Sequence, residues 1–274
     1  MRYTIYKILL LIQKEFIKEL SYRLSFFLQF FSAVMQTLIF YFVAQVFGSG
    51  VGVAAPALAR YNGDYFSFVL IGLAFMGYIN TGMRTFSDAI RIEQMLGTLE
   101  FILTTPTRLS VVLLSKLIWN FLYDSFHLSI YFVMGVFFLS AKYTGQSLWA
   151  IPLIMLLSLA AFSSLGLLSA GFIIVFKRGD PVNMFFSFAS ILLGGVYYPI
   201  EVMPAGLQRA AEFLPITYTL RLMRDAAIRG ASLAELTPDL LKLSLLTLVM
   251  FPLSLWFISH ALRRAKQDGS LTHY

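Results

Sequence analysis

The sequence has no cysteine and little charge. Without thiols the chain can form no disulfide, iron–sulfur cluster or thiolate nucleophile. Charged residues make up only 13% of the chain, against about 25% in typical soluble domains. Hydrophobic residues make up 58% and include 27 Phe, which is more apolar surface than a soluble domain of this size can bury. The composition therefore excludes an ordinary soluble protein.

Sequence motifs of common enzymes are missing as well. The chain has three His and contains no H-E-x-x-H, G-x-S-x-G or paired-carboxylate pattern, so an intramembrane hydrolase is not expected. It also lacks the G-x-x-x-x-G-K-[ST] loop that cradles nucleotide phosphates. We therefore expect a non-catalytic chain that holds no cofactor or metal of its own.

The sequence does contain long apolar runs, of 17 to 25 residues each. That length is enough to cross a hydrocarbon layer of about 30 Å. The expected fold class is an all-α integral membrane protein with one transmembrane domain, 1–274, made of an interfacial helix (1–23), a six-span bundle (24–260) and a tail (261–274). The six spans are predicted at about 24–47, 66–84, 117–139, 152–176, 182–198 and 240–260. The fifth run is short, so it either tilts or dips back into the membrane.

Positive charge is distributed unevenly along the chain. If both termini lie in the cytoplasm, fourteen of the 21 Lys and Arg residues fall on the cytoplasmic side. Because short basic loops tend to stay in the cytoplasm, this orientation is the expected one, and an even number of spans agrees with it. The net charge of +7 is therefore explained by membrane orientation, and no nucleic-acid partner is expected.

The first 23 residues have an amphipathic pattern. Ile8, Ile12, Phe16 and Leu20 lie on one helical face, and three lysines lie on another. A basic amphipathic helix of this kind is suited to lie in the membrane interface. A signal peptide is the competing interpretation, but the apolar core is short and charged residues follow it without a cleavage-like site.

A second amphipathic segment lies between the second and third spans. The spacing predicts a helix over 88–104, with Ser87 as its N-cap. This helix is too short and too charged to cross the membrane. Its polar stripe consists of Glu93, Gly97, Glu100 and Thr104. Two interpretations are open: a solvated helix that rests on the membrane, or a docking helix on which Gly97 gives a partner access to the backbone.

The segment 199–239 is unlike an ordinary loop. Prolines divide it, and two short helices are predicted, at 205–214 and 216–229. Gly230 follows the second one, in the position where a left-handed residue ends a helix. A folded extracellular loop is the simplest interpretation. Tyr197 and Tyr198 precede this segment, and they either form an interfacial aromatic belt or line an exit.

Polar residues also occur inside the predicted spans. In the first span Ser25, Gln29, Ser32 and Gln36 fall on one helical stripe. Lipid would not tolerate this stripe well, so it faces either a neighbouring helix or a transport pathway.

The third span contains Asn120, Asp124 and His127. Asp124 and His127 are three residues apart on one helix face, so they can form a hydrogen bond. An ionisable pair inside a membrane indicates a functional site, and two roles are open: a proton relay or a structural tie between spans. One such pair is thin support for a relay, so the tie is favoured.

Two motifs resemble one known family. Residues 93–107, E-Q-M-L-G-T-L-E-x-x-L-x-T-P-T, are similar to the segment between the second and third spans of ABC-2 type transporter permeases. Residues 194–230, which contain GGVYYPIEVMP and LPITYTLRLMR, resemble a second region of the same family. The number of spans, the N-terminal helix and the length agree too, so the resemblance extends over essentially the whole chain.

The resemblance implies that 88–104 is a coupling helix that docks onto a separate ATPase subunit. The residues that match the motif are Glu93, Gly97, Thr98, Glu100, Thr105 and Pro106. It also implies a second permease subunit, identical or different, and a first span that faces the subunit interface and the pathway. Between spans five and six it implies a re-entrant helical hairpin.

The function implied by the resemblance is that of the membrane subunit of a bacterial ATP-driven exporter in the inner membrane. ATP and magnesium would then be held by the partner ATPase. The substrate is expected to be amphipathic: a drug-like compound, a lipid or a lipid-linked glycan. The alternative is a proton-coupled secondary transporter that uses Asp124 and His127, and a third hypothesis is a membrane scaffold that transports nothing.

Overall fold

The computed structural model describes residues 2–47, 58–61, 64–105, 107, 109–138, 143, 147–176 and 180–267. Within these ranges the chain is helical and contains no β-strand. The longer helices are α1 (Arg2–Ser21), α2 (Arg23–Phe47), α4 (Tyr65–Met95), α6 (Leu109–Val133), α7 (Ile151–Phe176), α8 (Pro181–Leu193) and α11 (Leu233–Gln267). The shorter ones are α5 (Leu99–Thr104), η1 (Met134–Phe138), η2 (Leu148–Ala150), η3 (Ile200–Val202), α9 (Ala205–Ala211), α10 (Pro215–Arg224) and η4 (Asp225–Arg229).

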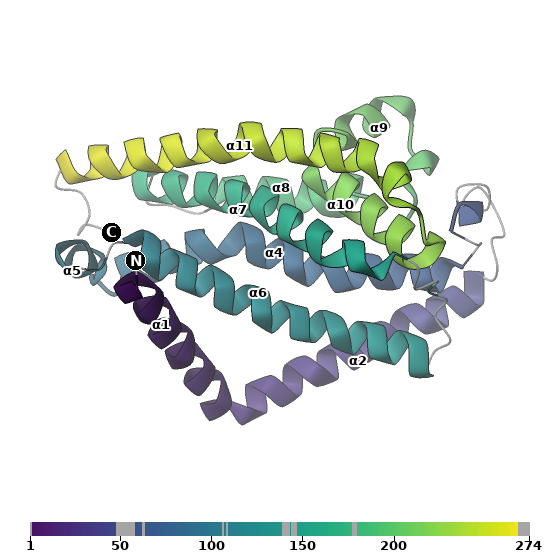
Figure 1. The fold of residues 1–274 in the computed structure, drawn as a ribbon, viewed down its shortest axis with the longest axis horizontal. Coiled ribbons are helices and arrows are strands. Elements are labelled where there is room, and N and C mark those ends of the chain that lie inside the picture. The colour runs from purple at the N-terminus through teal and green to yellow at the C-terminus, as the bar shows by residue number, and fades with distance from the viewer. Residues whose placement is uncertain are drawn as a thin grey trace.

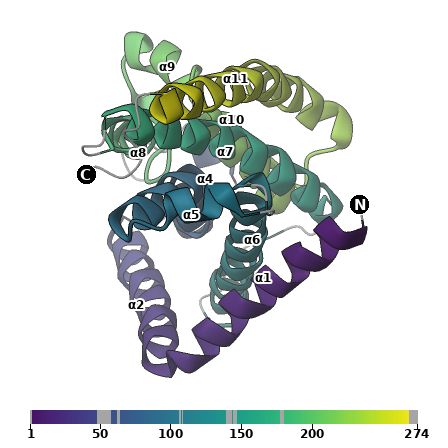
Figure 2. The same cartoon turned by 90° about the vertical axis from the view of Figure 1, so that its left-hand side faces the viewer.

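Helices α4, α6, α7 and α11 run side by side along the long axis of the molecule, whereas α1 and α2 slant away from it and meet in a V (Figure 1). Seen from the α5 end, α7 lies between α11 on one side and α4 on the other, and α6, α2 and α1 lie beyond α4 (Figure 2). The start of α1 and the end of α11 lie at the same end of the molecule as α5 (Figure 1). This placement agrees with two termini on one side of a membrane.

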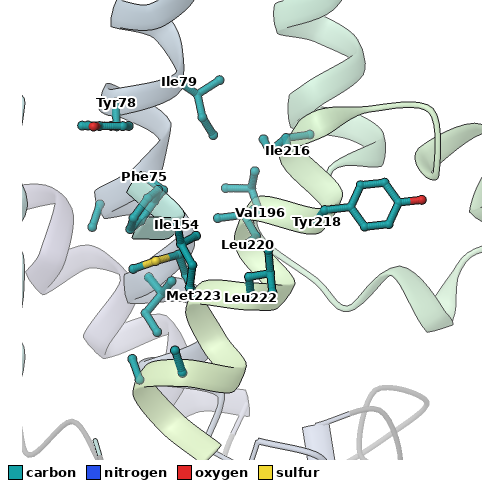
Figure 3. Close-up of a cluster of buried hydrophobic side chains, with 14 of the residues drawn as sticks. Phe75, Tyr78, Ile79, Ile154, Val196, Ile216, Tyr218, Leu220, Leu222 and Met223 are labelled. Atoms are coloured by element: carbon teal, nitrogen blue, oxygen red, sulfur yellow. The ribbon is translucent and has the colours of Figure 1, made fainter. Parts of the chain in front are cut away.

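The core lies where α4, α7 and α10 meet. Figure 3 shows the side chains that fill it: Phe75, Tyr78 and Ile79 of α4, Ile154 of α7, Val196, and Ile216, Leu220, Leu222 and Met223 of α10. Most of them are fully buried. Helices α4 and α7 approach closely, because a Cβ added at Gly166 would lie 2.7 Å from the Gly82 carbonyl oxygen. The centre of the molecule is therefore packed as tightly as a soluble core.

The number of long spans differs from the expected six. Among the described residues, five helices are long and apolar enough to cross a membrane: α2, α4, α6 with η1, α7 and α11. The helix expected at 182–198 is α8, which ends at Leu193 after 13 residues. It rises only about 20 Å, short of the ~30 Å needed. The predicted C-terminal boundary was wrong because Gly194 and Gly195 end the helix, the latter with a φ of +72°.

The predicted start of the second amphipathic segment was also wrong. Helix α4 continues without a break from Tyr65 to Met95, so Ser87 is not an N-cap. It is fully buried, and its hydroxyl donates to the Arg84 carbonyl within the helix. The true N-cap is Asp64, which accepts from the Phe66 amide. The predicted segment 88–104 is thus the last turns of α4, a turn over Leu96–Thr98, and α5.

The two short helices predicted within 199–239 are confirmed. The first is α9, and the second is α10 continued by η4. Gly230 ends the second in the left-handed conformation, with φ 66° and ψ 32°. Nearly every residue of α10 and η4 is buried inside the bundle. The segment is therefore an internal element of the fold, whereas α9 lies at its edge (Figure 1).

The N-terminal helix is confirmed as α1, and it packs on the bundle. Its Phe16 ring meets the edge of Trp119 in α6 at 5.9 Å. Near its start, Lys7 Nζ donates to Thr107 Oγ1 at 2.8 Å. The helix thus contacts α6 directly and is tied to Thr107, three positions after the end of α5.

Candidate functional site

A polar cavity of about 400 Å³ lies between α2, α4 and α6. Figure 2 shows α2 and α6 on the side of α4 that faces away from α7. Gln29, Ser32 and Gln36, three residues of the stripe predicted in the first span, line it together. The stripe therefore faces a cavity, in agreement with the pathway interpretation, and its role there is a proposal.

Tyrosines of α6 hold this stripe in place. The Tyr131 hydroxyl donates to Gln36 Oε1 at 3.0 Å. The Tyr123 hydroxyl lies 2.8 Å from Gln29 Oε1 and 2.9 Å from Glu19 Oε1 of α1. The helix-packing interpretation of the stripe is therefore also met, because the same polar residues connect α2 to α6 and border the cavity.

Tyr197 and Tyr198, which are neighbours in the sequence, have different surroundings. Tyr197 lines the cavity and stacks on Phe40 of α2, with ring centroids 5.5 Å apart. Tyr198 is absent from the cavity wall, and its hydroxyl donates to the Leu192 carbonyl at the end of α8. Tyr198 therefore supports the C-terminal end of α8. Only Tyr197 fits the prediction that these tyrosines line a pathway.

The polar residues of the third span connect α6 to α4. Asn120 Nδ2 donates to Thr85 Oγ1 at 2.8 Å. Asp124 lies beside Thr81 of α4. Both contacts are of the structural-tie kind, and they reach the most deeply buried of the five long spans.

A hydrogen bond between Asp124 and His127 is not formed among the described residues. His127 Nδ1 lies 3.2 Å from the Tyr123 carbonyl, and its ring lies 4.6 Å from the Tyr123 ring. The Oδ2 atom of Asp124 is buried and has no hydrogen-bond partner. A direct proton relay between the two side chains therefore lacks the contact it needs, although both line the same cavity.

The candidate docking segment begins where α4 ends. Gly97 adopts a φ of +68°, and the Thr98 amide and hydroxyl both bond to Glu93, the amide to its carbonyl at 2.9 Å. At the other end of α5, the Thr105 hydroxyl donates to the Ile102 carbonyl at 2.7 Å. Four of the six residues that match the motif thus build the turn and the end of α5. The Glu100 side chain and Pro106 lie outside the described residues.

The surface of this segment is open and apolar. Met95, Leu96 and Phe101 are 65%, 69% and 71% exposed. A Cβ added at Gly97 would meet no atom within 4 Å. Exposed apolar residues beside an accessible backbone are typical of an interaction surface.

Arg224 is a buried charge at the opposite end of α4. Its Nη1 donates to the Gly195 carbonyl at 2.7 Å, its Nη2 to the Val196 carbonyl and its Nε to the Phe68 carbonyl, both at 3.1 Å. The guanidinium also lies 3.4 Å from the centroid of the Phe68 ring. Burial lowers the pKa of Arg224 to about 10, so it keeps its charge at neutral pH.

These contacts explain how α8 can stop inside the bundle. A helix end leaves carbonyls unpaired, and non-helical backbone at membrane depth is tolerated only where protein or water satisfies it. Arg224 satisfies the carbonyls directly after the break. This role could not be predicted from the sequence, because the three carbonyls belong to segments far from residue 224 in the chain.

The other charges of this end pair across elements. Asp225 Oδ2 accepts from Arg60 Nη2 at 2.6 Å, and Arg229 lies 3.9 Å from the same carboxylate. Arg221 lies 3.5 Å from Asp239 of α11. Together these ion pairs fasten η4 to the segment before α4, and α10 to α11.

Within a multi-pass bundle, the long helix α4 lines a polar cavity along its middle and leads, through the turn at Gly97, to an exposed segment around α5. The family model of the ABC-2 type transporter matches residues 6–228. No curated protein matches the chain at a significant level. The matched region includes the cavity, the α4–α5 turn and Arg224, which accounts for most of the features described above. The chain is therefore a membrane permease, and it belongs to the ABC-2 type transporter family.

Proposed function

We propose that the chain is the permease subunit of an ATP-driven exporter that moves an amphipathic substrate out of the cell. Family membership supports a partner ATPase subunit. In this proposal ATP and magnesium are held by that partner, and a second permease subunit, identical or different, completes the pathway. The membrane is the inner one, with both termini in the cytoplasm.

The observation that carries this proposal is the continuity of α4. This helix has 31 residues and extends about 46 Å at 1.5 Å per residue. At one end it leads directly into α5, and along its middle it lines the cavity and the core. A force applied to α5 would therefore reach the cavity through one rigid, buried element.

The docking surface in this proposal is the α4–α5 turn. Glu93, Gly97, Thr98 and Thr105 shape the turn and the end of α5, and Glu100 and Pro106 complete the motif. The turn presents exposed apolar side chains and an open backbone position at Gly97. Through the hydrogen bond of Lys7 to Thr107, a movement of α5 would also be passed to α1.

The experiment is a pull-down of the detergent-solubilised protein, with mass spectrometry of the chains that co-purify. Wild type is compared with Glu93→Arg/Glu100→Arg. The matched control is Glu201→Arg/Glu212→Arg, which makes the same charge change on exposed residues at the opposite end of the molecule. We expect wild type and control to bring down a chain with a phosphate-binding loop, and the docking variant to lose it.

Two results would count against the proposal. If no ATPase co-purifies with wild type under gentle conditions, the exporter has no energy source, and pH-dependent transport through Asp124 and His127 becomes the next test. If the docking variant retains the ATPase as well as the control does, the ATPase binds elsewhere and the α4–α5 turn is not the docking surface.

A further inference from the structure

The polar cavity has an unusual charge and ring content. Four tyrosines line it: Tyr78, Tyr123, Tyr131 and Tyr197. Among the residues that line it, Asp124 is the only one of the Asp, Glu, Lys and Arg types. The chain as a whole carries a net charge of +7, so a cavity whose one formal charge is a carboxylate stands apart from the rest of the molecule.

Asp124 has unused capacity to accept hydrogen bonds. It lies beside Thr81, and its Oδ2 atom is buried without a hydrogen-bond partner in the part of the chain that the structure describes. An unsatisfied buried acceptor costs about 1–3 kcal/mol. Asp124 also lines the cavity, so a hydrogen-bond donor or a positive charge in the cavity would be attracted to its carboxylate. A negatively charged group would instead be repelled.

The tyrosine rings favour the same sign of charge. The face of an aromatic ring carries partial negative charge and attracts cations, especially where water is excluded. The hydroxyls of Tyr123 and Tyr131 are already engaged with Gln29 and Gln36, which holds both rings at the cavity wall. Rings and a carboxylate around one space are the elements by which proteins recognise organic cations.

A second hollow adjoins the cavity and is almost entirely apolar. It has a volume of about 390 Å³ and lies where α1, α2 and α6 meet. Its wall is made by Phe16, Leu20, Phe26, Trp119, Leu122, Tyr123 and Phe126, with Glu19 and Arg23 also bordering it. Tyr123 lines both hollows, and its hydroxyl bonds to Glu19 on one side and Gln29 on the other.

We propose that the two hollows form one bipartite site for an amphipathic organic cation. The positive head group lies among the tyrosines next to Asp124, and the apolar body lies in the aromatic hollow beside α1. Tyr123 stands between the two parts. The inference names the substrate class of the exporter and rests on the proposed function for transport, but binding itself requires no ATPase. It disfavours substrates whose head group is a phosphate.

The test compares two probes of the same shape and opposite charge. Tetraphenylphosphonium is a cation with an apolar body, and tetraphenylborate is the matching anion. Binding to the purified full-length protein in detergent is followed by quenching of tryptophan fluorescence, because Trp119 lines the apolar hollow. We expect saturable binding of the cation. The affinity for the anion should be lower than that for the cation by a factor of roughly ten or more.

Variants assign the effect to each part of the site. Asp124→Asn should weaken cation binding roughly tenfold and remove the discrimination between the probes. Asp124→Glu should restore the discrimination, and Phe126→Ala should weaken both probes alike. The matched control is Asp88→Asn, which removes a carboxylate from α4 outside both hollows. Monodispersity and the thermal midpoint of every variant establish that it is folded.

The outcomes are separable from those of the pull-down. If the two probes bind equally well, or if Asp124→Asn binds the cation as wild type does, the cation site is refuted. If cation binding depends on Asp124 but no ATPase co-purifies, the bipartite site stands and the ATP-driven exporter does not.

Discussion

The two ends of α4 are built in opposite ways. At its N-terminal end the Phe68 carbonyl is buried and bonded to Arg224, which also holds the backbone after α8. At the α5 end the helix stops in an open turn at Gly97, next to exposed Met95 and Leu96. The comparison shows which end is fixed by packing and which end is free to meet another chain.

The difference follows from what each end would lose if it moved. Displacing the N-terminal end of α4 would break the hydrogen bonds of three buried carbonyls to Arg224. Water would then have to supply the missing donors in an apolar interior. Displacing the α4–α5 turn would cost few packed contacts, since no neighbour lies within 4 Å of the Gly97 Cβ position. The largest losses of stability on mutation are therefore expected at the N-terminal end of α4.

Replacing Arg224 should have the largest effect. Arg224→Leu leaves three buried carbonyls without donors, and each unsatisfied acceptor costs about 1–3 kcal/mol, so we expect at least about 3 kcal/mol of lost stability. The thermal midpoint and the fraction of monodisperse protein in detergent measure it. The control is Arg221→Leu, which removes a half-buried arginine with a single 3.5 Å ion pair. Equal losses in both variants would contradict the special role of Arg224.

Replacing Gly97 should have a smaller effect. Gly97→Ala has room for its methyl group but must adopt a φ of +68°, which costs about 1 kcal/mol in a non-glycine residue. Gly97→Asn should cost less, because Asn tolerates this conformation. The thermal midpoint measures the cost.

A control with the opposite sign is available in α9. Gly206 is helical and also has nothing within 4 Å of its Cβ position, so Gly206→Ala should be neutral or stabilising by up to about 1 kcal/mol. If Gly97→Ala behaves like Gly206→Ala, the turn at Gly97 is not the strained feature inferred here.

The smallest expected effect is a pH dependence at Asp225. Burial raises the pKa of this carboxyl above its ordinary value of 3.8, while its hydrogen bond from Arg60 opposes the rise. A carboxyl whose pKa is raised on folding favours the folded state fully below its unfolded pKa, and this advantage is lost as the pH rises through the folded value. Wild type should therefore lose stability relative to Asp225→Asn between about pH 4 and neutrality.

Thermal midpoints of the two proteins in detergent at several pH values measure this difference. If the difference between the two midpoints is the same at every pH, or if wild type gains stability relative to Asp225→Asn as the pH rises, the ion pair with Arg60 outweighs the burial of Asp225.

Much of the fold could be predicted from the sequence because it depends on local patterns. Apolar length located the helices α2, α4, α6, α7 and α11, and the left-handed residue at Gly230 located the end of η4. The stripe of Gln29, Ser32 and Gln36 predicted a polar face, since three residues at helical spacing must point the same way.

The features that could not be predicted depend on distant partners. The stripe that suggested a helix over 88–104 continues the helical period of α4. Sequence periodicity therefore did not reveal that α4 ends at Met95. The contacts of Arg224 could not be predicted because its partners are 28 to 156 residues away in the chain. Asp124 and His127 have helical spacing that permits a contact, but Thr81 and the Tyr123 carbonyl compete for them.

The broken helix α8 has a consequence for how the protein is made. With 13 residues it is too short to enter a bilayer as a stable span, and the carbonyls after its break find their donor only at residue 224. During synthesis the chain must therefore be extended by a further thirty or so residues before this region can settle. We expect the last third of the protein to be inserted as one unit, so truncations between α8 and α10 should be recognised as misfolded even though every preceding long span is complete.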